Sequence, residues 1–374
     1  MRSRLAAARQ QLGWSQARLV SELERRGRAT GFVVMATTSL KTAVSRWENG
    51  HNIPDRDYRR LFRDIFGKTD AELGFASAAL VAVEQDQVDM ELRDRIAAST
   101  RIDTSMIELL QAQTENIRRL DRRLGAPVLL DQMRMHIETL RRLLHHSVLD
   151  STRRPIAAAL ADAAALAGWQ ALDVGSISRA WEHYETATTA GRVSDQPALL
   201  AHAKGEQAYA LLDLDQPTAA LALVRDARQE AGSSIPDRLV SWLWSAEAEA
   251  AAACGLDLDC RRALDRAADV LPNGAAVDPD LPYVSLDEHH LARWRGSTLA
   301  RLGDHEAVEQ LTNALAVANP EYVRAKGSLH VDLAQALSAA DARDAAVEHI
   351  RLAKNLATQI GSVRQRRRLA RLAA

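Results

Sequence analysis

The sequence predicts an all-α protein with three parts. Apolar residues recur at helical spacing in short segments of residues 1–76 and follow a rough heptad in longer segments of residues 77–150. Residues 151–374 are rich in Ala and repeat one pattern about every 40 residues. A chain of 374 residues can hold two or more domains. We therefore expect a small helical domain at 1–76, a linker with a long helical hairpin at 77–150, and a helical repeat domain at 151–374.

Five helices are expected in the first region. Each has apolar residues on one face and residues typical of helix ends at its borders, so the five can share one core. The expected helices are Ser3–Leu12, Gln16–Arg25, Ser39–Gly50, one that starts at Asn52–Asp55, and one from Thr69 to about Phe75.

The third of these segments, SLKTAVSRWENG, has two contrasting faces. Ser39 is a good N-cap, and Asn49–Gly50 ends the helix because Gly adopts the left-handed conformation without strain. Leu40, Val44 and Trp47 form the apolar face. The opposite face carries the hydrogen-bond donors Lys41, Thr42, Ser45 and Arg46. Lys and Arg on such a face can bind guanine O6 and N7 in the major groove of double-stranded DNA, and the alternative is an ordinary surface helix.

The stretch LAAARQQLGWSQARL, followed by SRWENG and Pro54, resembles the Cro/phage-repressor-like (XRE-type) helix-turn-helix DNA-binding domain over about the first 75 residues. The resemblance implies base contacts from Lys41, Thr42 and Arg46, on the face that also carries Ser45. It implies contacts to the DNA backbone from Ser15, Gln16, Asn49 and His51. It also implies an ion pair between Arg9 and Glu48 that ties the first helix to the end of the third.

This chain departs from the compact family pattern by about a dozen extra residues, mostly in Arg26–Thr38. We expect a longer second helix and a loop in place of the usual tight turn. The apolar stretch Phe32–Met35 is either a plug for the domain's core or a dimer contact, and we favour the plug.

Charge separates the first region from the rest. Residues 1–75 hold 14 Lys or Arg against 8 Asp or Glu, a net charge of +6, whereas the whole chain has a net charge of −1. A basic first region followed by an acidic remainder is typical of a phosphate-binding module attached to a different kind of domain. Arg outnumbers Lys 43 to 5, a bias typical of GC-rich genomes such as those of actinobacteria.

The composition excludes several classes of protein. No apolar run reaches about 18 residues and the first residues lack the apolar core of a secretory signal, so we expect no membrane segment and a cytoplasmic location. The two cysteines, Cys254 and Cys260, exclude a disulfide scaffold and have no nearby paired ligands for zinc. The pairs His145–His146 and His289–His290 lack a carboxylate at working spacing, so we expect no metal site and no cofactor.

The linker region predicts two long helices. A heptad from Met106 to Leu124 stops at Gly125–Pro127, and apolar spacing resumes from Leu129 to Leu144. These helices form a dimer seam or pack on the body of the same chain. We favour packing within the chain for most of the pair, with part of it in a dimer contact.

The Ala-rich region repeats a small–large–small pattern, which lets antiparallel helices approach closely. The copies are Ala180-x3-Tyr184-x2-Ala187, Ala220-x3-Val224-x2-Ala227, Cys260-x3-Leu264-x2-Ala267, Ala307-x3-Leu311-x2-Ala314 and Ala346-x3-Ile350-x2-Ala353. The pattern resembles tetratricopeptide repeats, which stack into a superhelix with a concave face. A generic helical bundle is the alternative.

In the superhelix, the first helix of each pair lines the concave face. Alignment of the copies places eight aromatic, charged or His residues there: Trp169, Asp173, His202, Tyr209, Trp242, Glu249, His290 and Arg293. Such a face suits a peptide, a small molecule or a small protein, although it lacks the Asn side chains by which repeat-bearing peptide sensors hold a peptide backbone. The alternative for each residue is a structural role. The final run Arg364–Arg371 is expected to be a solvated basic helix end, or to touch DNA or the acidic body of a second subunit.

The sequence offers no phosphate-binding Gly-rich loop, nucleophile elbow or metal-ligand set, and we expect no enzyme. The favoured interpretation is a transcriptional regulator that binds an operator as a homodimer through its first region. Its repeat domain would then serve dimerisation and sensing of an effector. The alternative is a helical-repeat adaptor that binds a partner protein and for which DNA binding is secondary.

Overall fold

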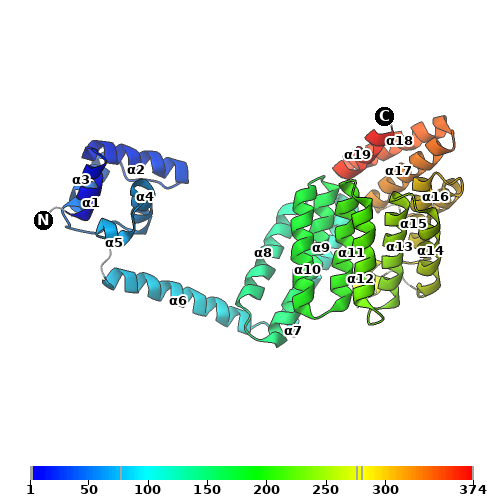
Figure 1. Cartoon of the computed structure of the whole chain (residues 1–374), viewed down its shortest axis with the longest axis horizontal. Helices are drawn as coiled ribbons and strands as arrows, with labels where there is room; N and C mark the ends of the chain where they lie inside the picture. The colour runs from blue at the N-terminus through cyan, green and yellow to red at the C-terminus, as the bar shows by residue number, and fades with distance from the viewer. Residues whose placement is uncertain (1–2, 76–77, 275–276, 279–280, 320, 373–374) are drawn as a thin grey trace. The chain divides into compact units, whose positions relative to one another are not determined.

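The computed structural model describes residues 3–75, 78–274, 277–278, 281–319 and 321–372, with only the main chain for 78–88 and 277. The chain divides into two compact units, Met1–Asp94 and Arg95–Ala374. The division therefore differs from the three expected regions, since most of the expected linker belongs to the second unit. Figure 1 labels the helices of both units.

The first unit consists of short helices around an aromatic core. Its helices are α1 (Arg4–Gln11), α2 (Gln16–Thr30), α3 (Thr37–Glu48), α4 (Arg56–Phe66) and α5 (Asp70–Leu73), and α6 (Ala78–Thr100) continues into the second unit. The Trp47 ring lies 5.1 Å from that of Tyr58 and 5.7 Å from that of Phe62. Four helix N-termini are capped by side chains, those of Ser3, Ser15, Asp55 and Thr69. All five expected helices are present in the described part of this unit.

The expected N-cap of the third helix is wrong. α3 begins two residues before Ser39, and Ala36 occupies the N-cap position without a side-chain hydrogen bond. The Thr37 hydroxyl donates to a carboxylate oxygen of Glu24 at 2.6 Å, which ties the start of α3 to α2. Because this contact fixes the first turn from outside, the helix starts earlier than local capping signals predict. The expected apolar face of Leu40, Val44 and Trp47 is buried.

The extra residues between α2 and α3 extend α2 to Thr30 and then form a loop, as expected. Phe32 packs edge-on against Tyr58 at 5.2 Å and Val34 also contacts the core, whereas Val33 is 90% exposed. A Cβ on Gly27 would lie 2.2 Å from a methyl group of Val34, so this close approach requires glycine. The expected plug thus consists of alternate residues, and Val33 between them points outward.

The second unit is an array of antiparallel helix pairs that follows two long helices (Figure 1). The long helices are α7 (Thr104–Leu124) and α8 (Leu130–His146). The pairs among the described residues are α9 (Asp150–Asp173) with α10 (Ile177–Ser194), α11 (Pro197–Asp213) with α12 (Pro217–Ala231), α13 (Asp237–Ala253) with α14 (Asp257–Val270), α15 (Glu288–Leu302) with α16 (Glu306–Ala316), and α17 (Val323–Ala339) with α18 (Arg343–Gln359). The short α19 (Val363–Leu372) packs against α17, α18 and α9.

The small–large–small copies lie on the second helix of each pair, α10, α12, α14, α16 and α18. Their small residues are buried, and the large residue of the first copy, Tyr184, is completely buried. Its ring lies against the main chain of α9 at Gly168, where a Cβ would be 2.5 Å from a ring carbon. The expected stacking of close helix pairs, with a large side chain filling the gap, is therefore confirmed, and the generic bundle is not what forms.

The two long helices pack within the chain. Leu110 and Ile117 of α7 and Met133 and Leu140 of α8 share one buried cluster with apolar residues of α9. α9 is also the one described helix long and apolar enough to span a membrane, and 78% of its apolar window is buried inside the unit. Such burial is typical of a core helix.

The all-α expectation misses a short hairpin between α14 and α15. Strands β1 (Val277–Asp278) and β2 (Leu281–Ser285) pair antiparallel, with Val277 opposite Ser285. Leu281 and Val284 are buried against the helices while Tyr283 is half-buried. The segment is short and contains a Pro, so periodicity alone did not reveal a strand.

The contact between Gly168 and Tyr184 gives a stability prediction. Gly168→Ala should lower the free energy of unfolding by about 1–3 kcal/mol, because the new methyl group meets a buried ring that cannot move aside. Gly327→Ala on α17 is the matched control: its Cβ would find the nearest atom at 3.5 Å, so better helix propensity should leave stability unchanged or raise it by up to about 1 kcal/mol. Calorimetric melting of the full chain measures both. Equal effects of the two variants would contradict the close packing.

Candidate functional site

The first candidate site is the outward face of α3. Lys41, Thr42 and Arg46 are exposed and Ser45 is half-buried, on the side opposite the buried Leu40. The side chains of Lys41 and Arg46 have no hydrogen-bond or ion-pair partner among the described residues, so both charges are available to a ligand. We call Lys41, Thr42, Ser45 and Arg46 the recognition face.

An ion pair behind this face holds α3 in place. Arg9 donates from Nε to Oε1 of Glu48 at 2.5 Å and from Nη2 to Oε2 at 2.9 Å. The hydrogen bonds to Glu48 raise the pKa of Arg9. Arg9 also donates to the carbonyl of Trp14 at 2.5 Å, and Gln16 donates to Oε2 of Glu48 at 2.7 Å. The expected Arg9–Glu48 pair is present and joins α1, the following turn, α2 and α3.

The four residues expected to contact a DNA backbone lie at the start of α2 and just after α3. Ser15 caps α2 by accepting from the amide of Arg18 at 3.1 Å, and the side-chain amide of Asn49 donates to the carbonyl of Ser45 at 2.8 Å. His51 is exposed just after α3, and Gln16 is exposed although its amide bonds Glu48. All four are therefore at the surface of the unit.

The second candidate site is a cavity of about 530 Å³ inside the second unit, which we call the central cavity. The inner helices α7, α9, α11, α13, α15, α17 and α19 line it, together with Tyr283 of β2. All eight residues expected on the concave face line this cavity: Trp169, Asp173, His202, Tyr209, Trp242, Glu249, His290 and Arg293. The alignment of the repeat copies in the sequence thus selected residues from four helices that line one cavity in the structure.

Buried ion pairs that the sequence did not predict span the cavity wall. Arg324 of α17 binds Asp121 of α7 at 2.5 and 2.8 Å and Asp173 of α9 at 3.2 Å. The carboxylates of Asp121 and Asp173 raise the pKa of Arg324, although burial acts against its charge. The partners are far apart in sequence, so helical spacing could not reveal them.

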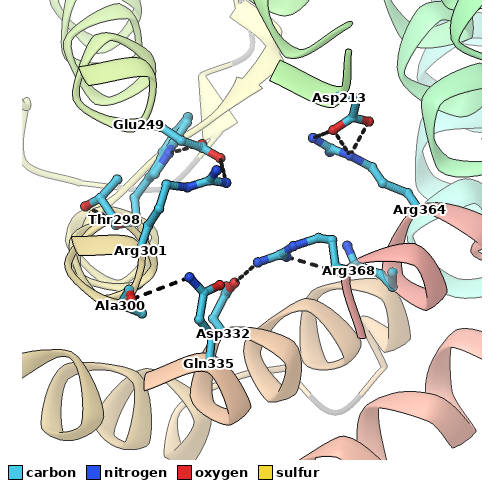
Figure 2. Close-up of polar contacts among 11 residues, drawn as sticks. Asp213, Glu249, Thr298, Ala300, Arg301, Asp332, Gln335, Arg364 and Arg368 are labelled. Atoms are coloured by element: carbon cyan, nitrogen blue, oxygen red, sulfur yellow. Dashed lines mark hydrogen bonds and ion pairs between the residues drawn. The ribbon is translucent and has the colours of Figure 1, made fainter. Parts of the chain in front are cut away.

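Part of the final Arg run contributes to the same wall, which corrects the expected role for Arg364 and Arg368. Arg364 binds Asp213 at 2.8 Å, and Arg368 binds Asp332 at 2.5 Å, as Figure 2 shows. Arg371 lies 3.4 Å from Asp215. Arg364 and Arg368 thus lie in the wall of their own unit rather than on a solvated face, whereas Arg366, Arg367 and Arg371 are exposed, as expected of a basic helix end.

Aromatic side chains form the apolar part of the wall. The rings of Trp169 and Tyr209 meet edge-on at 5.9 Å, and the Arg364 guanidinium lies 5.1 Å from the Trp169 ring. Trp242 packs on Trp294 at 5.9 Å, and Trp294 donates to Glu249 at 3.0 Å. Cation–π and edge-on contacts hold these rings in fixed orientations.

Two titratable groups on α11 lie in the wall without full partners: His202 is buried and Glu206 is half-buried. Burial raises the pKa of Glu206 to about 7, against which the hydrogen bond from the Tyr184 hydroxyl, at 3.3 Å, acts. Burial lowers the pKa of His202 to about 3. His202 Nε2 lies 3.7 Å from Glu206 and has no hydrogen-bond partner among the described residues. His202 follows the expected repeat alignment, whereas Glu206, one turn later on the same face, was missed.

The described residues contain no group of three or more His, Cys, Asp or Glu that could hold a metal ion. His145 and His146 pack ring to ring, and His290 Nδ1 lies 2.6 Å from a carboxylate oxygen of Asp287.

Comparison with known proteins gave solved structures only. No family model matches the sequence, and no curated protein matches it. Among solved structures, a Rap protein complexed with Competence and Sporulation Factor has a TM-score of 0.45 and 12% identity, covering 95% of this chain and 99% of that one. BtubC from P. vanneervenii has a TM-score of 0.42 and 14% identity over 63% of this chain and 92% of its own.

A third structure, the TPR-like repeats of a putative kinesin light chain from Podosopora anserina, has a TM-score of 0.33 and 17% identity, covering 52% of this chain and 92% of that one. Every TM-score is below 0.5, so nothing about the activity of this chain follows from these structures.

The raised pKa of Glu206 predicts a pH dependence of stability. Between pH 4.5 and about 7 the unfolded chain loses this proton while the folded protein keeps it, so the free energy of unfolding falls as pH rises through this window. Glu206→Gln removes the ionisation and should be more stable than wild type at pH 8 by up to about 3 kcal/mol, and equal to it below pH 4.5.

Thermal melting of both proteins from pH 4 to 8 measures this difference. Glu182→Gln, which neutralises an exposed carboxyl on α10, is the control and should follow the wild-type pH profile. A Glu206→Gln profile parallel to that of wild type would contradict the burial of an ionisable Glu206.

Proposed function

We propose that this protein is a cytoplasmic transcriptional regulator that binds operator DNA through the first unit and an effector through the second. The observation that carries the proposal is the recognition face of α3. It offers two hydroxyl groups and two cations that have no partner among the described residues, on a helix whose other side is fixed by the aromatic core and by the Arg9–Glu48 pair.

The geometry of the recognition face suits the major groove. A helix fits this groove, and Lys or Arg at its surface binds the acceptors O6 and N7 of guanine. Ser15, Asn49 and His51 lie at the surface beside the ends of α2 and α3, where amide and hydroxyl donors can bind phosphates. The net charge of +6 over residues 1–75 adds attraction to the phosphate backbone that does not depend on sequence.

The central cavity supports the effector-binding part of the proposal. Its volume of about 530 Å³ lies within the range typical of small-molecule sites, about 300–1,000 Å³. Its wall combines fixed aromatic rings with buried polar groups, an arrangement that gives a ligand both apolar contact and orientation. The ligand is therefore a small molecule, or a peptide of a few residues.

The DNA-binding part predicts different effects for two kinds of variant. Arg46→Ala and Lys41→Ala should each weaken operator binding by about 1–3 kcal/mol and reduce the preference for operator over random DNA, because they remove base contacts. Arg28→Ala, an exposed charge on α2, is the control of equal charge change. It should alter binding to both DNAs alike.

Gel shift or fluorescence anisotropy with the DNA upstream of the protein's own gene and with random DNA of equal length measures both affinities at one fixed salt concentration. An equal loss on the two DNAs for Arg46→Ala would contradict a base-contacting role. Wild-type affinity for operator in both α3 variants would contradict DNA binding through this face.

We also propose that two copies associate, because a single helix-turn-helix head contacts few base pairs and buries only about 600–1,000 Å². Two heads about 34 Å apart would bind two half-sites on one side of the duplex. Sedimentation of the full chain at tens of micromolar should give twice the mass of one chain. A monomer under these conditions, and a one-to-one complex with operator DNA, would contradict the homodimer.

A further inference from the structure

The charges of the central cavity are almost fully paired with one another. Each of six lining arginines contacts at least one carboxylate, and for five of them a contact is 3.4 Å or shorter. The sixth, Arg301, lies 3.8 Å from Glu249. The six are Arg118, Arg301, Arg324, Arg364, Arg368 and Arg371. These pairs neutralise each other and leave little charge for a ligand.

Two lining arginines are the exception. Arg122 of α7 and Arg293 of α15 have no hydrogen-bond or ion-pair partner among the described residues, and both are half-buried. Both cations also oppose protonation of His290 and help to lower its pKa, after the larger effect of burial. His290 and Arg293 lie one turn apart on α15, and Arg122 of α7 lines the same cavity.

The acidic residues of the cavity do not compensate these cations. Six of them each form an ion pair with an arginine: Asp121, Asp162, Asp173, Asp213, Glu249 and Asp332. Glu206 remains, and burial raises its pKa to about 7, which disfavours its charged form. Of the lining groups that the structure describes, Arg122 and Arg293 thus offer two positive charges without a carboxylate partner.

The rest of the wall is suited to an apolar group. The rings of Trp242 and Tyr283 enclose His202 at 5.1 and 4.8 Å, and Trp294 packs on Trp242. His202 is only 5% exposed, and its Nε2 has no hydrogen-bond partner among the described residues. A buried ring nitrogen without a partner is costly unless a ligand bonds it, so the aromatic side also points to a bound molecule.

We propose that the central cavity binds a small molecule with an aromatic or apolar body and one carboxylate or phosphate group, which Arg122 and Arg293 bind on the His290 side. Guanidinium groups bind both anions through paired N–H donors. The body of the molecule lies against Trp242 and Trp294. This inference rests on the effector-binding part of the proposed function and names the chemistry of the effector.

Calorimetric titration of the full chain tests the charge requirement with three probes that share one aromatic body: 1-naphthoate, 1-naphthyl phosphate and neutral 1-naphthalenemethanol. At least one anion should bind tenfold or more tightly than the alcohol, and the tighter of the two identifies carboxylate or phosphate as the preferred group. Arg122→Gln and Arg293→Gln should each lower the affinity for that anion about 10- to 100-fold and leave the affinity for the alcohol unchanged.

Arg119→Gln is the matched control, since it removes an exposed charge from the same helix as Arg122 and should leave the anion affinity unchanged. Equal affinities of all three probes, or wild-type anion affinity in both variants, would overturn the proposal. Melting temperatures of the variants establish that they are folded. Binding of operator DNA by the wild-type chain is measured separately. If the chain does not bind operator DNA but prefers the anion to the alcohol, the result contradicts the proposed regulator and supports this site.

Discussion

The second unit depends on the ion pairs of Arg324 with Asp121 and Asp173. They join α17, near the end of the array, to α7 and α9 at its beginning, across 203 residues in the case of Asp121. Both carboxylates are only 3% exposed and Arg324 is 12% exposed, so each charge relies on the others for solvation. Loss of one member leaves uncompensated buried charge, at a cost of about 3–5 kcal/mol.

The repeat periodicity predicted the helix pairs but not the ion pairs that join helices far apart in the array. Small residues around Tyr184 and its equivalents determine how closely neighbouring helices approach, and that information is local in sequence. It also sufficed to align the inner helices, so that residues as distant as Trp169 and Arg293 were placed on one surface, the one that became the cavity wall. The pairs made by Arg324 and Arg364 depend on the curvature of the whole array, which the spacing of one helix does not contain.

The same division applies to the first unit. The Arg9–Glu48 contact was expected through a resemblance, and Leu40, Val44 and Trp47 were expected to be buried from their spacing alone. The start of α3 was misplaced because its first turn is held by Glu24 of α2, a contact between helices rather than a capping signal. Gln16 was expected only to contact a DNA backbone. Its side-chain amide also donates to Glu48, a contact that alignment with the family pattern did not reveal.

The contacts of α19 have a consequence for the order in which the chain acquires its structure during synthesis. Arg364 reaches Asp213 across 151 residues, and Ser362 reaches Asp173 across 189. The helix pairs form from neighbours in sequence and can assemble as they leave the ribosome, whereas these contacts wait for residues 362–371. Until then, Asp213 and Asp332 lack the cations they bind in the finished wall. The wall of the central cavity therefore stays incomplete until residues 362–371 have been made, even when all of its helix pairs have already formed.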